Sequence, residues 1–168
     1  MDQSTKKHEI VLSIIIIITA LWFGIFATSE NVKIRGGLPF LEEGKQLLRH
    51  RAILEGHAGN PWQYRVLSAY LIEGAIQLLI KINIPHPIAV SFIMCRVLLG
   101  TAICICAFIY YQKLGLSRGL AFNGMLLLGW GMSYAHYDSD LQFNTYFDIL
   151  FYLLVVLCIL HKRLFWLI

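Results

Sequence analysis

The chain has 168 residues, of which 58% are hydrophobic and only 14% are charged. A soluble domain is roughly half apolar and roughly a quarter charged, so this composition excludes an ordinary soluble globular protein. The formal net charge of +4 does not indicate nucleic-acid binding, because the basic residues lie beside apolar runs, where such residues set membrane topology or contact anionic headgroups.

The apolar residues are gathered in long runs, and these runs decide the fold class. They indicate that lipid is the solvent, and in lipid the backbone polar groups of a single span must be bonded within it. We therefore predict an all-α fold for residues 1–168: one integral membrane unit, built as a polytopic transmembrane helical bundle. Four spans are expected, at about 10–28, 88–111, 119–136 and 145–160.

The segment before the first span is polar and contains Lys6 and Lys7. A cleaved signal peptide is the alternative to an uncleaved first helix. The apolar run is too long for a signal peptide, and no clear small-residue cleavage pattern follows it. We favour a first helix that stays in the membrane with its N-terminus in the cytoplasm.

The first loop, residues 30–87, contains the one long polar segment of the chain, from Leu38 to Tyr70, and its first interfacial helix is predicted at about 39–55. Pro39 suits a helix start, because the N–H that proline lacks is not needed there. Glu42 and Glu43 then fall in the first turn, where the helix dipole favours negative charge. An apolar stripe along the same segment favours a helix that lies on the membrane surface.

A second helix is predicted in this loop at about 64–82. Its polar residues Glu73, Gln77 and Lys81 recur every four positions and therefore share one face. Such a stripe is typical of a helix that lies in the interface or packs against protein.

The basic residues favour one topology over its alternative. If 64–82 crossed the membrane, the later basic segments would lie on the side opposite to the N-terminal lysines. If it lies in the interface, all the basic segments near span ends are cytoplasmic, as the positive-inside rule requires. We therefore predict that both chain ends are cytoplasmic and that residues 30–87 are external.

This topology places several chemically competent side chains on one side of the membrane. Carboxylates near a dry boundary can act as general bases, and arginine can hold phosphate. The alternative for the paired glutamates is that they are simply solvated residues at a helix start. The residues concerned are Glu42, Glu43, His50, His57, Arg65, Asp138 and Asp140.

Arg96 and Asp148 lie inside predicted spans. A charge in a span is costly and normally faces protein, a partner charge or a cavity. These two residues could pair with each other, which would be a structural role, or Arg96 could face a lipid phosphate.

A metal site is not predicted. His50 and His57 are seven residues apart, which is wider than the usual spacing of metal ligands. The cysteines lie inside apolar runs and are interpreted as small packing residues. They are Cys95, Cys104, Cys106 and Cys158. Cofactors stay open, with a divalent metal as one option.

The order of these features resembles the N-terminal part of GT-C glycosyltransferases, in the branches that transfer aminoarabinose or that mannosylate proteins. One span is followed by an external loop that opens on the acidic motif Leu38–Glu43, and a Pro- and aromatic-containing motif, Asn60–Leu67, precedes the next helix. Arg96 matches an arginine early in the following span, and His136–Asp140 matches a short acidic external loop.

The resemblance implies transfer of a sugar from a polyprenyl phosphate to an external acceptor, in the plasma (inner) membrane of a bacterium. Glu42, or alternatively Glu43, would deprotonate the acceptor, and Asp140 or Asp138 would position it. The residues that would contact the donor and its phosphate are Arg65, Arg96, Tyr64 and His57.

The chain departs from this family in two respects. The first acidic residue of the motif is Glu42, where the family usually has aspartate, and the family continues with many more spans. We therefore expect the N-terminal part of a longer enzyme, inactive in isolation and served by a C-terminal partner chain. The alternative is a small non-enzymatic membrane protein, such as an assembly partner or a transporter fragment; internal repeats would favour a transporter, and the sequence contains none.

Overall fold

The computed structural model describes residues 3–34, 36–59, 66–134 and 144–161, and the structural statements below concern this part of the chain. It contains helices and no strand, which confirms the all-α prediction. The helices are α1 (Gln3–Ile34), α2 (Leu38–Glu42), α3 (Lys45–Leu54), α4 (Val66–Lys81), α5 (Pro87–Lys113), α6 (Arg118–Tyr134) and α7 (Asn144–Leu160).

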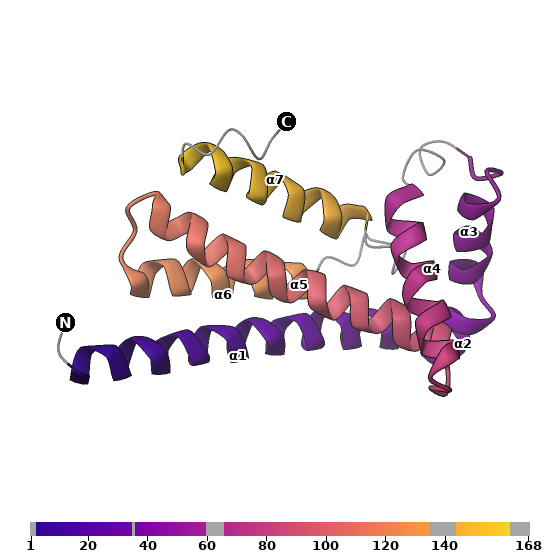
Figure 1. Cartoon of the computed structure of the whole chain (residues 1–168), viewed down its shortest axis with the longest axis horizontal. Helices are drawn as coiled ribbons and strands as arrows, with labels where there is room; N and C mark the ends of the chain where they lie inside the picture. Colours follow the sequence, from indigo (N-terminus) through magenta and orange to yellow (C-terminus); the bar gives the residue numbers. More distant parts are fainter. Residues whose placement is uncertain (1–2, 35, 60–65, 135–143, 162–168) are drawn as a thin grey trace.

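The helices form two groups (Figure 1). The long helices α1, α5, α6 and α7 run lengthwise, and α5 contacts each of the other three. The helices α2, α3 and α4 gather at one end, where α3 and α4 run across the long direction of the bundle. We call these three helices the end module.

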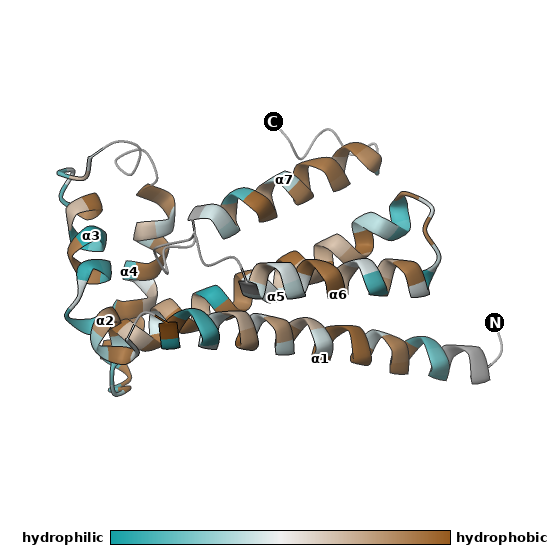
Figure 2. Ribbon diagram, turned by 180° about the vertical axis from the view of Figure 1, so that it is seen from behind, coloured by the Kyte–Doolittle hydropathy of each residue, from teal (hydrophilic) through white to brown (hydrophobic). Residues whose placement is uncertain are grey.

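Two of the described helices are long and apolar enough to cross a membrane: Lys7–Ile34 within α1, and Pro87–Lys113, which is α5. In Figure 2 apolar residues predominate along the long helices, with hydrophilic residues interspersed, and α3 is hydrophilic over much of its length. The helices α6 and α7 each have 17 residues, fewer than the ~20 that usually span a bilayer. Length and composition thus support two spans, and the predicted spans at 119–136 and 145–160 stay predictions.

Glycines set the packing of α1 against α5 and α6. A Cβ atom on Gly24 would lie 2.7 Å from the carbonyl oxygen of Val97, and one on Gly129 would lie 2.5 Å from the ring of Phe23. Small residues of this kind let membrane helices approach closely.

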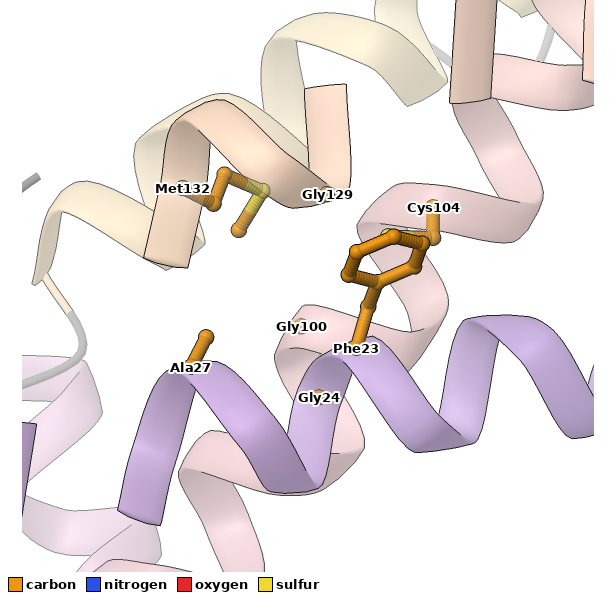
Figure 3. A pocket seen from close by; sticks show the side chains of 7 residues that line it. All are labelled: Phe23, Gly24, Ala27, Gly100, Cys104, Gly129 and Met132. Atoms are coloured by element: carbon orange, nitrogen blue, oxygen red, sulfur yellow. The ribbon is translucent and has the colours of Figure 1, made fainter. Parts of the chain in front are cut away.

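Figure 3 shows this junction, where Phe23 projects from α1 between α5 and α6. The space beside it leaves no room for a water molecule, so the junction is a packing contact and not a ligand cavity. It is lined by Phe23, Gly24, Ala27, Gly100, Cys104, Gly129 and Met132.

The single helix predicted at 39–55 is wrong, because the segment forms two helices, α2 and α3. They are separated at Gly44, where a Cβ atom would lie only 2.5 Å from the carbonyl oxygen of Phe40. Glu42 is therefore the last residue of α2, and Glu43 is its C-terminal cap. Neither occupies the first turn of a long helix, so the helix-dipole argument for these two glutamates is also wrong.

The helix predicted at 64–82 is present as α4, which packs on α3 and α5. Its buried face includes Ile72 and Ile76, which share one core cluster with Leu41 of α2 and Phe92 of α5. The opposite face exposes large apolar side chains. These are Leu67, Tyr70, Leu71 and Leu78.

Candidate functional site

Glu42 and His86 form a pair where the end module meets α5. The Nδ1 atom of His86 lies 2.8 Å from Oε1 and 2.9 Å from Oε2 of Glu42. An ionised carboxylate only accepts hydrogen bonds, so Nδ1 is the donor. In the neutral ring the other nitrogen, Nε2, then carries the lone pair. The His86 side chain is 60% exposed and that of Glu42 is 25% exposed, so the pair is open to solvent mainly through the imidazole.

The backbone holds His86 in an uncommon conformation. This residue lies between Pro85 and Pro87 and has φ 54° and ψ 52°, in the left-handed region. Few residues other than glycine adopt this region, and a following proline restricts the preceding residue to extended conformations. Pro87 then begins α5. On the other side of the pair, fully buried Leu41 anchors α2. The positions of the two side chains are thus fixed by the start of α5 for His86 and by α2 for Glu42.

A second pair, His50 and Glu73, joins α3 to α4 inside the end module. The Nε2 atom of His50 lies 3.0 Å from Oε2 of Glu73 and donates to it. The rings of His50 and Phe92 pack nearly perpendicular to each other, with 5.6 Å between centroids. The Nδ1 atom of His50 is buried and has no hydrogen-bond partner among the described residues.

The pKa of Glu73 lies below its usual range. The main cause is the hydrogen bond that Gln77 donates to Oε1 at 2.7 Å, and the hydrogen bond from His50 adds to it. The polar stripe predicted on this helix therefore exists. Within it Gln77 binds Glu73, and Glu73 also binds His50 of α3. Because the His50 side chain is buried, a molecule from solvent cannot reach its imidazole. We therefore interpret this second pair as a contact that holds α3 against α4.

Arg96 is buried in the bundle, with only 1% of its surface exposed. Its Nη2 atom donates to the hydroxyl of Tyr146 at 3.2 Å, and its guanidinium lies 4.3 Å from the centre of the same ring. The expectation that Arg96 faces a lipid phosphate is therefore wrong. Arg96 lies ten residues beyond His86, or roughly 15 Å along α5, so the two are not neighbours.

Of the other predicted site residues in the loop, the structure describes Glu43 and His57. His57 lies beyond the end of α3, is 80% exposed and approaches Glu55 at 3.8 Å. Glu43 donates its backbone N–H to the carbonyl of Pro39. The remaining candidates lie outside the described residues. They are Tyr64, Arg65, Asp138 and Asp140.

Sequence reasoning missed His86, although one signal was present. A histidine between two prolines has little backbone freedom, and such rigidity is useful where a side chain must be aimed. It also missed that His50 and Glu73 meet, because no spacing rule connects residues on two separate helices. Tyr146 was missed as the aromatic neighbour of Arg96.

A metal site receives no direct support. The part of the chain that the structure describes contains no group of three or more His, Cys, Asp or Glu side chains that could hold a metal ion. The four cysteines are free thiols.

Among the described residues, Glu42 and His86 form a solvent-accessible carboxylate–imidazole pair within hydrogen-bond distance, at one end of an apolar helical bundle. A pair of this kind can transfer a proton to or from a molecule at that surface. Comparisons with known proteins add no assignment, because no protein-family model, curated protein or solved structure matches this chain.

Proposed function

We propose that the chain is a membrane glycosyltransferase of the GT-C type, or the N-terminal part of one, which moves a sugar from a polyprenyl phosphate to an external acceptor. The observation that carries the proposal is the Glu42–His86 pair. It provides a proton acceptor on the loop that follows the first long apolar helix, which is the position that the family resemblance assigns to the catalytic carboxylate.

The proposal includes the setting of this pair. The long helices cross the plasma membrane of a bacterium, and the end module lies at the external surface. The apolar face that α4 turns away from α3 suits contact with lipid, since α4 runs across the bundle and not along it. A polyprenyl chain stays in the bilayer, so its phosphate would reach the reaction from the membrane side of the same surface.

The reaction needs a base, because a hydroxyl acceptor must lose its proton as it attacks. The bond between the anomeric carbon and the phosphate oxygen breaks, and the electron pair stays on the polyprenyl phosphate. General-base help of this kind contributes typically about 10²–10⁴ in rate. Donor contacts by Tyr64, Arg65 and His57 and a C-terminal partner chain belong to the proposal as the resemblance implies them.

The test uses membranes from cells that lack the chain and carry either the wild type or a variant. Release of polyprenyl phosphate would be measured from a panel of polyprenyl-phosphate sugars. We expect release to depend on the wild-type chain and to fall about 10²–10⁴-fold in Glu42→Gln, with a smaller loss in Glu43→Gln. Glu55→Gln, at an exposed glutamate, is the matched control and should keep wild-type release at equal protein levels.

If no donor in the panel responds to the chain, the glycosyltransferase proposal fails. Stable co-purification with a membrane complex in the same cells would then favour the alternative, a non-enzymatic assembly partner.

A further inference from the structure

The two ends of the Glu42–His86 pair are not equivalent. Both carboxylate oxygens of Glu42 lie within 2.9 Å of the same atom, His86 Nδ1. The carboxylate therefore accepts the Nδ1–H of His86, and only 25% of its side chain is exposed, whereas His86 is 60% exposed and has a second nitrogen that faces no described partner within hydrogen-bond distance.

From this geometry we infer that the group that takes the proton is Nε2 of His86, and that Glu42 is a positioning residue. This inference rests on the proposed function for its reaction. Glu42 accepts from Nδ1–H, which fixes the tautomer and leaves the lone pair of the neutral ring on Nε2. The same logic applies wherever a carboxylate orients a histidine base.

The backbone provides an independent observation. Strained backbone at a residue other than glycine persists only when the surroundings enforce it, and such residues concentrate at functional sites. His86 is left-handed directly before a proline, and its ring reaches back to α2 across 44 residues of sequence. A histidine that merely capped α5 would need neither feature, and His86 makes no side-chain cap hydrogen bond to this helix.

In the reaction, Nε2 accepts the proton of the acceptor hydroxyl as the acceptor oxygen bonds to the anomeric carbon. The phosphate leaves with the electron pair of the broken bond. The imidazolium that results is stabilised by the Glu42 carboxylate at 2.8 Å, and its proton passes to water after transfer.

The key variant is His86→Asn. Asparagine tolerates the left-handed region, and its side-chain amide can still donate to Glu42 from nearly the position of Nδ1. It has no counterpart of Nε2. We expect His86→Asn to lower release of polyprenyl phosphate by about 10²–10⁴-fold in the same membranes. The double variant with Glu42→Gln should be no slower than His86→Asn, because the two residues act as one unit. His8→Gln, at an exposed histidine of α1, should keep wild-type release.

A second measurement does not depend on activity. Ring ¹⁵N shifts of the full chain in lipid nanodiscs, at a pH where the imidazole is neutral, report which nitrogen carries the proton. We expect the proton on Nδ1 in the wild type and a shift toward Nε2 in Glu42→Ala, with the His86 signal assigned by its loss in His86→Asn.

The outcomes separate the two proposals. Near-wild-type release in His86→Asn with a large loss in Glu42→Gln would overturn the role of His86 and leave the glycosyltransferase standing, with Glu42 as the base. A wild-type proton on Nε2 would overturn the inference whatever the activity. A proton on Nδ1 that depends on Glu42, in a chain that releases no polyprenyl phosphate from any donor, would remove the glycosyltransferase but support the oriented Nε2 base.

Discussion

Glu73 shows how a single carboxylate can connect two helices of the end module. It accepts from Gln77 on its own helix and from His50 on α3. Its pKa is held below the usual value of 4.5, chiefly by Gln77. A carboxyl with a lowered folded-state pKa contributes stability that is fully present above its unfolded pKa and is lost as the pH falls through the folded pKa. The contact between α3 and α4 should therefore weaken in acid.

We expect backbone hydrogen exchange in α3, corrected for intrinsic rates, to accelerate as the pH falls below about 4.5. In Glu73→Gln exchange should be faster at neutral pH and should depend much less on pH across this window. Glu55→Gln, at an exposed site, should keep the wild-type pH dependence. An unchanged acid loss in Glu73→Gln would show that other groups control it.

Arg96 gives a second prediction at the residue scale. Tyr146→Phe keeps the ring beneath the guanidinium and removes the hydroxyl, so it should cost ~1 kcal/mol of stability. Tyr146→Leu also removes the cation–π contact and should cost about 2 kcal/mol more in this desolvated site. Thermal unfolding in detergent would measure both.

The control for Arg96 is a tyrosine on the same helix. Tyr152 is 70% exposed, so Tyr152→Leu should shift the unfolding temperature little. Equal losses at Tyr146 and Tyr152 would mean that aromatic bulk on α7, and not the contact with Arg96, stabilises the bundle.

The sequence identified Arg96 and Glu42 as unusual for a sound physical reason. A charge within an apolar run must be satisfied by something, and an acidic motif after a span is conspicuous. The sequence could not identify their partners. Tertiary packing brings Tyr146 to Arg96 and His86 to Glu42, across 50 and 44 residues of sequence.

At the scale of elements, apolar periodicity located the helices well but missed the break between α2 and α3. The stripe of leucines continues through Gly44, so the pattern favours one helix. The break depends on the close approach of the chain to the Phe40 carbonyl, which excludes a side chain at this point and which no periodicity encodes.

Close packing between helices gives the prediction at this scale. In Gly24→Ala the new methyl group would meet the backbone carbonyl of Val97, which cannot move without α5. Overpacking of this kind costs typically about 1–3 kcal/mol. Gly131→Ala on α6 is the matched control, because a Cβ atom there meets nothing within 4 Å. We expect a lower unfolding temperature in detergent for Gly24→Ala only, and equal behaviour of the two would contradict tight contact between α1 and α5.

At the scale of the whole molecule, the end module and the bundle differ in the polarity of their exposed side chains. The long helix α1 exposes apolar side chains along much of its length and α5 exposes Met94 and Leu98, whereas α3 exposes the charged residues Lys45 and Arg51. The module covers one end of the bundle, and the chain N-terminus lies at the other (Figure 1). Which of these two ends faces the cytoplasm stays a prediction, made from the basic residues of the sequence.

Topology follows as the last prediction. With α4 lying in the interface, reporters fused after His57 and after Gly115 should lie on opposite sides, external and cytoplasmic. If α4 crossed the membrane instead, both would be external, so two external reporters would overturn the four-span arrangement.

A third fusion, after Ser139, tests α6. This helix has 17 residues, and its placement across the membrane rests on the charges around it and not on its length. An external reporter at Ser139 would support a span here, whereas a cytoplasmic one would show that α6 does not cross the membrane. That result would also place Asp138 and Asp140 on the side opposite to Glu42, and it would remove both aspartates from the proposed site.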